Sequence, residues 1–315
     1  MKKILLLATA TLSLTACKTA KIVDADNYKV QQTNVAKTLE YLASDALQGR
    51  DSGSEGIEKA ATYLENILSK AGVKPYFSTY KDTLSNFENA FNVVGYIEGT
   101  DPKLKNELVI LGAHYDHIGI SEKGFEGDFI NNGANDNASG TTVLSDIAKY
   151  LGATKNKKRS VLIVFFSAEE KGLLGSFHLA KKLKAQGMNV YTMLNFEMVD
   201  VPMKYDFELF MTGYSLSNMA TKLNEYAGAN LIGKSEMAEQ HNLFKASDNY
   251  PFYEAFQIPA HTVSAFDFSN FNYYHHPKDE FQIMDTQFMT DVAQKMLPVV
   301  TKMINAETDE IQMTK

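Results

Sequence analysis

Histidines and carboxylates recur along the chain where β-strands are expected to end. They form an ordered set of two imidazoles and three carboxylates, drawn from His114, Asp136, Glu169 or Glu170, Glu197, and His275 or His276. Parallel strands bring their carboxyl ends to one edge of a sheet, where α/β folds bind ligands. Nitrogen and oxygen donors of this kind suit zinc. One bridging carboxylate with two further ligands on each side would hold two ions ~3.5–4 Å apart, so the set predicts a two-zinc site.

Two members of the set also have a plain structural interpretation. The Gly- and Asn-rich turn around Asp136 can lead into a helix capped by Asn137 or Ser139, which leaves the aspartate free just outside the cap. The pair Glu169 and Glu170 can simply open a helix, because acids are favourable in a first helical turn. The same pair also suits a division of roles, in which one carboxylate ligates a metal and the other acts as a base.

The remaining members are equally ambiguous when each is taken alone. Asp116 stands two residues after His114, where its carboxylate could fix the tautomer of the imidazole. Glu197 lies near the end of an otherwise apolar strand, where a buried acid needs a metal or a basic side chain as its partner. His275 and His276 precede a proline and can form a surface turn. The metal interpretation therefore depends on the common position of these residues at one sheet edge.

The elements that must position this set alternate between strand and helix. Apolar, β-branched runs predict strands over 91–97, 108–113, 161–167, 192–199, 207–211 and 260–264. Helical spacing of apolar residues predicts helices over 56–71, 141–151, 173–184 and 287–304, the last with a kink at Pro298. The alternation predicts an α/β fold: a single three-layer domain with a central mixed, mostly parallel sheet and helices on both faces. The segment 121–140 has little periodicity, which predicts a long functional loop.

Composition excludes some functions. The net charge of −7 makes nucleic acid an unfavourable partner, because an acidic protein repels phosphate backbones. A basic run (Lys155, Lys157, Lys158 and Arg159) between an expected helix and an expected strand predicts a solvated turn. Walker, dinucleotide-binding, HExxH and GxSxG motifs are absent from the sequence.

The N-terminus carries a targeting signal. Lys2 and Lys3 are followed by an apolar stretch over 4–14 that is too short to span a bilayer. The sequence Leu-Thr-Ala-Cys then resembles a bacterial lipoprotein cleavage box, which would make Cys17 the lipidated first residue of a cell-envelope protein. An ordinary cleaved signal with an incidental cysteine is the alternative. Cys17 is the only cysteine, so no internal disulfide can form.

Five ordered motifs resemble those of the M28 zinc peptidases: AHYDH, GANDNASG, SAEE, NFEMVD and YYHHPKD. The segment LASDALQGRDSGSEGIEKAATYLENILSKAG is similar to the N-terminal helical region of bacterial members. SDNYPF resembles a segment that usually reads SDHxxF. The resemblance spans roughly residues 41–279, and it implies the fold and the two zinc ions of that family.

Carried over to this chain, the resemblance implies five metal ligands. Asp136 would bridge both ions, Glu170 and His275 would complete one site, and His114 and Glu197 would complete the other. Glutamate at position 197 departs from the usual aspartate. It keeps the charge but is one methylene longer, which puts the metal spacing and affinity in question.

The resemblance also implies catalytic roles. Glu169 would be the general base toward water activated by the two zinc ions, and Asp116 would support the first histidine. Tyr274 matches a position that stabilises the oxyanion in some members. His117 and His276 are interpreted as non-ligands. The implied function is an exopeptidase that removes N-terminal residues from peptides with a free N-terminus.

Other functions stay open beside this one. A carboxypeptidase would need basic residues that bind a substrate carboxylate, and the sequence does not identify them. Glutaminyl cyclases resemble the family but usually lack the first histidine and use tryptophan, which this chain does not contain. A non-catalytic envelope lipoprotein could use the same fold for binding. Aromatic residues before the last motif predict either an apolar specificity pocket or core packing: Phe266, Phe268, Phe271, Tyr273 and Tyr274.

The expected organisation has four parts. Residues 1–16 form the signal peptide, 17–30 a tether, 31–308 the peptidase domain and 309–315 a C-terminal tail. Attachment to a membrane is expected only through the lipid at Cys17.

Overall fold

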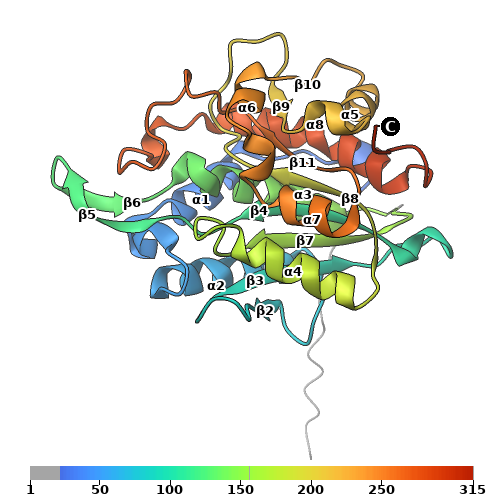
Figure 1. Cartoon of the computed structure of the whole chain (residues 1–315), viewed down its shortest axis with the longest axis horizontal. Helices are drawn as coiled ribbons and strands as arrows, with labels where there is room; N and C mark the ends of the chain where they lie inside the picture. Colours follow the sequence, from blue (N-terminus) through green and yellow to red (C-terminus); the bar gives the residue numbers. More distant parts are fainter. Residues whose placement is uncertain (1–21, 156, 315) are drawn as a thin grey trace, which may run out of the picture.

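A nine-stranded mixed sheet forms the centre of the computed structural model, which describes residues 22–155 and 157–314 (Figure 1). Its strands are β1 (Lys74–Pro75), β2 (Lys81–Thr83), β3 (Phe91–Ile97), β4 (Glu107–His114), β7 (Ser160–Phe166), β8 (Asn189–Phe196), β9 (Leu209–Met211), β10 (Ile232–Gly233) and β11 (Ala260–Ser264). Their order is β1-β3-β7-β4-β8-β11-β9-β10, with β2 paired to β3. The central strands β7, β4, β8 and β11 are parallel, whereas β3 and β9 run antiparallel to these neighbours.

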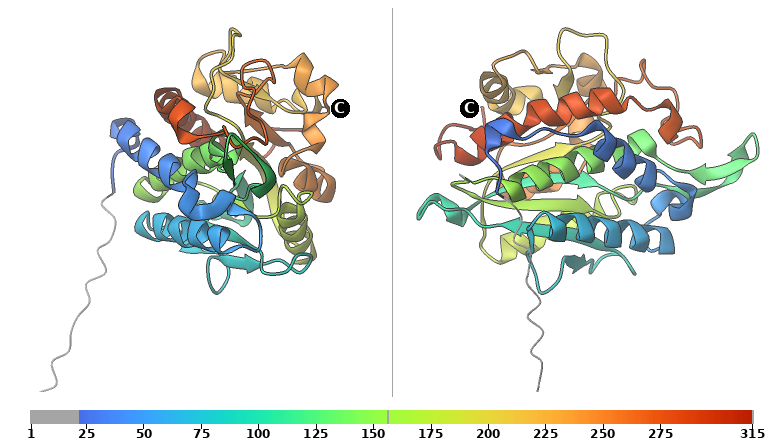
Figure 2. Two further views of the ribbon diagram at one scale, coloured as in Figure 1. Left: turned by 90° about the vertical axis from the view of Figure 1, so that its left-hand side faces the viewer. Right: turned by 180° about the vertical axis from the view of Figure 1, so that it is seen from behind.

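Helices cover both faces of the sheet (Figures 1 and 2). They are α1 (Gln32–Leu42), α2 (Glu55–Lys70), α3 (Gly140–Ala153), α4 (Leu174–Ala185), α5 (Met219–Ala227), α6 (Glu236–Gln240), α7 (Asn249–Phe256) and α8 (Thr286–Asn305). Along β7, Val161, Ile163 and Phe165 pack with α1, α2, α3 and α8, whereas Leu162 and Val164 pack with α4 and α7. A strand buried on both faces explains the continuous apolar run in the sequence. The expected α/β architecture with helices on both faces is confirmed.

All the strands and helices expected from the sequence are present, with ends shifted by a few residues. The C-terminal helix continues through Pro298 as one element. Helices α1, α5, α6 and α7 and the short strands β1, β2 and β10 were not expected. Glu197 lies just beyond the end of β8, not inside the strand, and the next residue, Met198, has a left-handed backbone (φ 50°).

The expected loop over 121–140 is wrong in part. Strands β5 (Gly119–Phe125) and β6 (Asp128–Asn131) pair there as an antiparallel hairpin that projects from the body of the molecule (Figure 1). A helical turn, Ala134–Ser139, follows it. Most of the hairpin residues are exposed or only half-buried, so the alternation of apolar and polar residues that marks a half-buried strand is missing.

The basic run is not a solvated turn, because two of its side chains are buried. Lys157 donates from Nζ to the carbonyl oxygens of Leu151 and Thr154 at the end of α3. Arg159 is fully buried and pairs with Glu107 at 2.8 Å. The long aliphatic stems let these cations reach polar partners from inside the fold.

Both ends of the described chain lie against the domain. The ring of Tyr28 packs edge-on against Tyr150, and Val30 is part of the main core. Near the other end, Ile311 is buried and Met313 bridges to Ser217. Cys17 and the signal segment fall outside the described residues. Among the helices of the described part, none combines the length and the apolar character needed to cross a membrane.

Candidate active site

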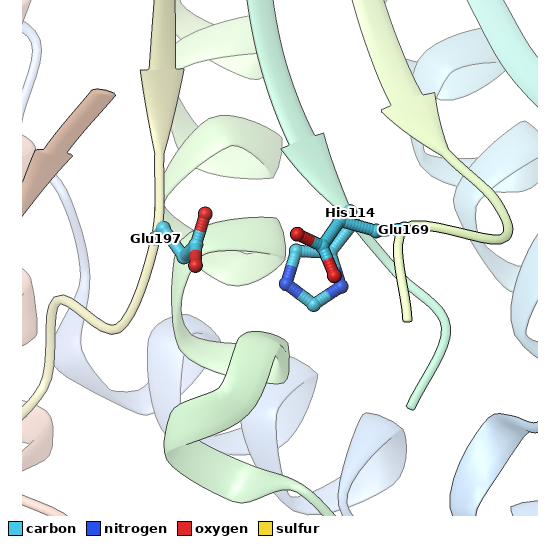
Figure 3. A group of neighbouring side chains, drawn as sticks. All are labelled: His114, Glu169 and Glu197. Carbon is cyan, nitrogen blue, oxygen red and sulfur yellow. The ribbon is translucent and has the colours of Figure 1, made fainter. Parts of the chain in front are cut away.

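Three of the expected site residues meet at the carboxyl ends of adjacent parallel strands (Figure 3). His114 is the last residue of β4, Glu169 follows β7, and Glu197 directly follows β8. Because β4 pairs with both neighbours, one potential ligand atom from each residue lies within 4.8 Å of the others. The backbone topology alone therefore gathers an imidazole and two carboxylates at one point of the sheet edge.

Asp136 joins this group to a second one. Its Oδ1 lies 3.3 Å from His114 Nε2, while its Oδ2 lies 3.3 Å from His275 Nε2 and 3.7 Å from His117 Nδ1. Glu170 completes the second group, with Oε2 at 3.1 Å from His275 Nε2. One carboxylate thus faces a different set of donors with each of its two oxygens.

Asp116 contacts His114 and the backbone of both glutamates that follow β7. The main-chain carbonyl of Asp116 is 3.1 Å from His114 Nδ1, and its carboxylate Oδ1 is 3.6 Å away. The carboxylate itself accepts hydrogen bonds from the backbone N–H groups of Glu169 (3.2 Å) and Glu170 (3.3 Å) and from the hydroxyl of Ser52 (3.2 Å). The expected support of His114 is therefore shared between the main chain and the side chain, and Asp116 also fixes the two glutamates.

Arg50, which sequence analysis did not single out, braces the loops that carry the donors. Its buried guanidinium donates to the main-chain carbonyls of Tyr115 (2.8 Å), Asn132 (2.6 Å) and Gly133 (2.9 Å), and also to that of Leu42. Burial lowers the pKa of Arg50 to about 10, although nearby carboxylates, beginning with Asp279, oppose the shift. Its presence in a motif far upstream of the donors gave no direct signal of this role.

Asp279 braces the same region from the other end of the chain. Its two oxygens accept hydrogen bonds from the N–H groups of Asn135 (2.7 Å) and Asp136 (3.0 Å). Burial raises the pKa of Asp279 to about 8, against the effect of these hydrogen bonds. The loop that presents Asp136 is thus fixed by side chains at both chain ends.

The backbone is strained at several residues around the donors. Ala168, Met198 and His275 have φ values of 57°, 50° and 54°, in the left-handed region that L-residues rarely adopt. Each such residue costs on the order of 1–3 kcal/mol, and strain of this kind clusters at functional sites. Ala168 and Met198 adjoin Glu169 and Glu197, and His275 is itself a candidate metal ligand. The unusual backbone conformations therefore occur at the residues that set the directions of these side chains.

Burial sets the electrostatics of the site. It raises the pKa of Glu169 well above the usual value and that of Glu197 to about 7, with neighbouring acids adding to both shifts. Burial alone would also raise the pKa of Asp136, but the imidazoles of His114 and His275, each with Nε2 at 3.3 Å from one of its oxygens, hold it well below the usual value. The cluster contains more carboxylates than its imidazoles can neutralise, so it favours cations.

The residues present fit a zinc centre. The Nε2 atom of His114 is buried without a hydrogen-bond partner in the described structure, and it lies 3.3 Å from Asp136 Oδ1. Buried polar groups are nearly always satisfied, so unpartnered imidazole nitrogens beside carboxylates indicate a ligand. Imidazole and carboxylate donors are those that zinc uses in catalytic sites. Each of the two donor groups supplies three residues: His114, Glu169 and Glu197 in one, and His117, Asp136 and Glu170 in the other.

The two histidines interpreted as non-ligands differ from each other. His276 lies beside the projecting hairpin, where its ring contacts Phe125 and its Nδ1 accepts a hydrogen bond from the N–H of Lys278. His117, in contrast, points its Nδ1 at Glu170 Oε1 at 3.0 Å and belongs to the second donor group.

An open cleft of about 450 Å³ exposes the donors to solvent. Its walls include Asp136, Glu169, Glu170 and Glu197, with Tyr274 on one side. The Tyr274 ring stacks on that of His275 at 3.9 Å between centroids. Burial and the site carboxylates raise the pKa of Tyr274, which keeps its hydroxyl protonated as a hydrogen-bond donor.

A smaller pocket of about 70 Å³ opens beside this cleft, with Glu197 and Tyr274 bordering both. Its other walls are mostly apolar or weakly polar: Met198, Phe210, Thr212, Leu243, Ala246, Ser247, Thr262, Ser264, Phe266 and Phe268. Of the aromatic residues that sequence analysis left undecided, Phe266, Phe268 and Tyr274 line this pocket. Phe271 and Tyr273 do not line it, and the buried ring of Phe271 packs against Phe266.

The molecule shares its fold with solved aminopeptidases. It is similar to the LapA aminopeptidase of Legionella pneumophila, with a TM-score of 0.69 and 18% identity over 88% of this chain and 73% of that one. It is also similar to a leucine aminopeptidase precursor of Bacteroides thetaiotaomicron, with a TM-score of 0.67 and 18% identity over 89% and 99% of the two chains. These likenesses concern the fold.

The family follows from the sequence match. A profile of peptidase family M28 matches residues 92–300, well over half of the chain, and the chain therefore belongs to that family. A probable leucine aminopeptidase of Trichophyton verrucosum is 29% identical over 71% of this chain and 59% of its own length. The aminopeptidase YwaD of Bacillus subtilis is 30% identical over 47% of this chain and 30% of its own length. The chain thus spans less than two thirds of these relatives.

Proposed function

We propose that the protein is an aminopeptidase that holds two zinc ions and uses Glu169 as its general base. The observation that carries this proposal is the placement of Asp136, whose two oxygens face two separate groups of donors at 3.3 Å. A bridging carboxylate of this kind is what a two-metal hydrolase needs. Zinc, when bound, supplies a Lewis acid that polarises a carbonyl and lowers the pKa of water to near ~7.

The residues of the chain divide the remaining chemistry. Glu169 faces the cleft beside His114 and can accept a proton as water adds to the scissile carbonyl carbon. It returns that proton to the amine as the C–N bond breaks, and the raised pKa of Glu169 suits a carboxyl that must hold a proton between the two steps. The Tyr274 hydroxyl can donate to the oxygen that becomes negatively charged.

The cleft and the side pocket favour a substrate with a free amino end and an apolar first residue. The clustered carboxylates attract a positively charged α-amino group. The pocket that shares Glu197 and Tyr274 with the cleft is lined by Phe210, Phe266 and Phe268, so it can take an apolar side chain. Its volume of about 70 Å³ limits it to a single side chain. Several similar proteins carry the name leucine aminopeptidase, which agrees with such a pocket.

The test is hydrolysis of aminoacyl-nitroanilides by the purified protein with and without a zinc chelator. We expect chelator-sensitive cleavage that returns when zinc is added and that prefers leucine and methionine over alanine by about 10- to 200-fold. N-acetylated leucine nitroanilide is the matched control and should resist cleavage. If zinc-loaded protein cleaves no free-amine substrate, the aminopeptidase proposal is wrong, and cyclisation of N-terminal glutamine would be measured next.

One residue favours a second candidate, a carboxypeptidase. Lys245 is exposed and lines the cleft, where its ammonium group could bind a substrate carboxylate. Cleavage of N-blocked peptides with a free C-terminus, lost in Lys245→Ala, would establish this activity. In an aminopeptidase the same variant should keep nitroanilide hydrolysis within a few-fold of the original.

We also propose that the protein is exported and anchored through a lipid on Cys17. The support is the sequence alone, because this segment lies outside the described residues. The lipid should add mass to the N-terminal peptide and hold the protein in the membrane fraction, and Cys17→Ser should remove both properties. An unmodified N-terminus would refute the anchor without affecting the peptidase.

A further inference from the structure

His117 stands in the second donor group although its position in the sequence suggested no such role. Its side chain is fully buried, with Nδ1 at 3.0 Å from Glu170 Oε1 and 3.7 Å from Asp136 Oδ2. The ring meets that of His275 edge-on, with centroids 5.6 Å apart. His117 is therefore placed with the same two carboxylates as His275.

The backbone holds His117 in this position. Its N–H donates to the carbonyl oxygen of Arg50 at 3.3 Å, so the chain turns back after β4 instead of continuing away. The ring lies against Gly133, where an added Cβ would come within 2.5 Å of the imidazole. Glycine at 133, in a left-handed conformation with φ 57°, makes room for the ring beside Asp136.

The donor separations match those around a single ion. Tetrahedral zinc with bonds of about 2.0–2.1 Å places its ligand atoms about 3.3 Å from one another. The contacts of His117 and His275 with Asp136 and Glu170 range from 3.0 to 3.7 Å. A hydrogen bond from His117 to Glu170 Oε1 explains one of these contacts. An ion shared by the four residues explains all of them if Glu170 presents both of its oxygens, Oε1 on the side of His117 and Oε2 on the side of His275.

We propose that His117 is a direct ligand of the metal ion held by Asp136, Glu170 and His275. This inference rests on the proposed function, since it assumes a metal in each donor group. An ion held there would have four protein ligands, the number found in structural zinc sites. An ion held by Asp136, His114 and Glu197 would have three, the number found in catalytic sites. The two sites would therefore differ in their number of protein ligands.

The experiment measures zinc binding rather than activity. Zinc stoichiometry and affinity are determined by competition with a chromophoric chelator for the original protein and for His117→Ala. His276→Ala is the matched control, because it removes a neighbouring imidazole that faces the hairpin. We expect two zinc ions of clearly different affinity in the original protein and in the control. In His117→Ala the tighter site should weaken by more than about 100-fold, beyond the 10- to 100-fold loss expected for a group that only supports a metal ligand.

A crystal structure of the zinc-loaded original protein gives a test that does not depend on the variant's folding. Anomalous density should lie about 2.0–2.1 Å from a His117 nitrogen. Zinc bound beyond 3 Å from His117, or equal affinities in the His117 and His276 variants, would overturn the inference and leave the proposed function intact. A protein that takes up no zinc at all would overturn both.

Discussion

Buried charged side chains lie at both ends of strands β4 and β7, but they are paired at the amino ends and only partly paired at the carboxyl ends. At the amino ends, Arg159 precedes β7 and Glu107 begins β4, and these two side chains pair at 2.8 Å. The guanidinium also donates to the carbonyl oxygen of Ala306 and stacks over the Tyr191 ring at 3.8 Å. At the carboxyl ends, acids outnumber imidazoles, and the Nε2 atoms of His114 and His117 have no hydrogen-bond partner in the described residues.

This difference separates a structural use of charge from a functional one. A buried charge that is fully paired holds chain segments together, and breaking the pair is costly. Buried donors that are left unpaired cost stability unless something outside the chain satisfies them. Both ends belong to the same strands and have similar burial, so burial alone does not identify the active end. The active end is identified instead by its surplus of carboxylates and by imidazole nitrogens that have no partner in the described residues.

The comparison is tested most strongly by the same substitution at both ends. Glu169→Gln should lower kcat by about 10²- to 10⁴-fold, because it removes a general base while keeping the shape of the side chain. Its zinc content should stay unchanged. Glu107→Gln should keep kcat within about twofold, since Glu107 touches no part of the cleft. Steady-state kinetics and zinc analysis of both variants check this. Equal losses of kcat at the two ends would contradict the functional distinction.

The opposite result is expected for stability at the amino ends. Arg159→Met should lower the free energy of unfolding by about 3–5 kcal/mol, because Glu107 is left as a largely buried, unpaired charge. Urea unfolding monitored by circular dichroism measures this loss. Zinc stoichiometry should remain that of the original protein at low temperature. Loss of zinc without loss of stability would show that the pairing at this end serves the metal site.

A smaller effect is expected at Asp279, which fixes the Asp136 loop without facing the cleft. Asp279→Asn replaces one of its two acceptor oxygens by an amide NH₂, so the loop loses a hydrogen bond from Asn135 or Asp136. Zinc affinity should fall by about 10- to 100-fold, as is usual for groups that support metal ligands. Isothermal titration calorimetry with zinc provides the measurement. An unchanged zinc affinity would mean that other residues hold the Asp136 loop in position, and Arg50 would be examined first.

The smallest effect concerns Asp200, a buried acid outside both donor groups. Burial raises its pKa to about 7, against a hydrogen bond from the N–H of Asp285. A raised pKa means that the folded state binds more protons than the unfolded state between about pH 4 and 7, so Asp200 lowers stability as the pH rises through this range. Asp200→Asn should therefore stabilise the protein by about 1–2 kcal/mol at pH 8. This is less than the whole pKa shift from 3.8 to about 7 would give at about 1.4 kcal/mol per pKa unit.

The matched measurement for Asp200 is made at acid pH. Near pH 4 the aspartate is protonated in the fold, and most of the advantage of asparagine should disappear. Thermal unfolding at the two pH values distinguishes this from a general packing effect, which would be the same at both. A stabilisation that grows toward low pH would have the wrong sign.

The sheet could be predicted because its strands are buried on both faces. The run Val161–Phe166 is apolar at every position, and this pattern does not depend on distant residues. The hairpin of β5 and β6 could not be predicted in this way. Its residues Ser121, Glu122 and Lys123 are at most partly buried, so no periodicity in apolar residues records the pairing. The pattern of apolar residues in the sequence therefore records which strands are buried in the fold, and it does not record strands that stay exposed.

The site shows the same limit. Asp136, Glu170 and His275 were predicted as neighbours, because the resemblance of their motifs to those of the M28 peptidases implies it. His117 was interpreted as a non-ligand, because the ligand set implied by the resemblance to the M28 peptidases does not include it. The turn of the chain after β4 depends on the hydrogen bond from His117 to Arg50, a residue 67 positions earlier. Long-range contacts of this kind leave no periodic trace, so the position of His117 beside Glu170 and Asp136 could not be predicted from the sequence.

The bracing of the Asp136 loop from both chain ends also bears on when the protein becomes active during its synthesis. Arg50 emerges early from a ribosome, whereas His275 and Asp279 emerge only after nearly the whole sheet has been made. Until then one donor group lacks an imidazole, and the loop between the two groups lacks half of its support. We expect the nascent chain to be inert toward peptides and to gain activity abruptly on completion. Chains that stop short of residue 279 should therefore lack any activity that depends on this site.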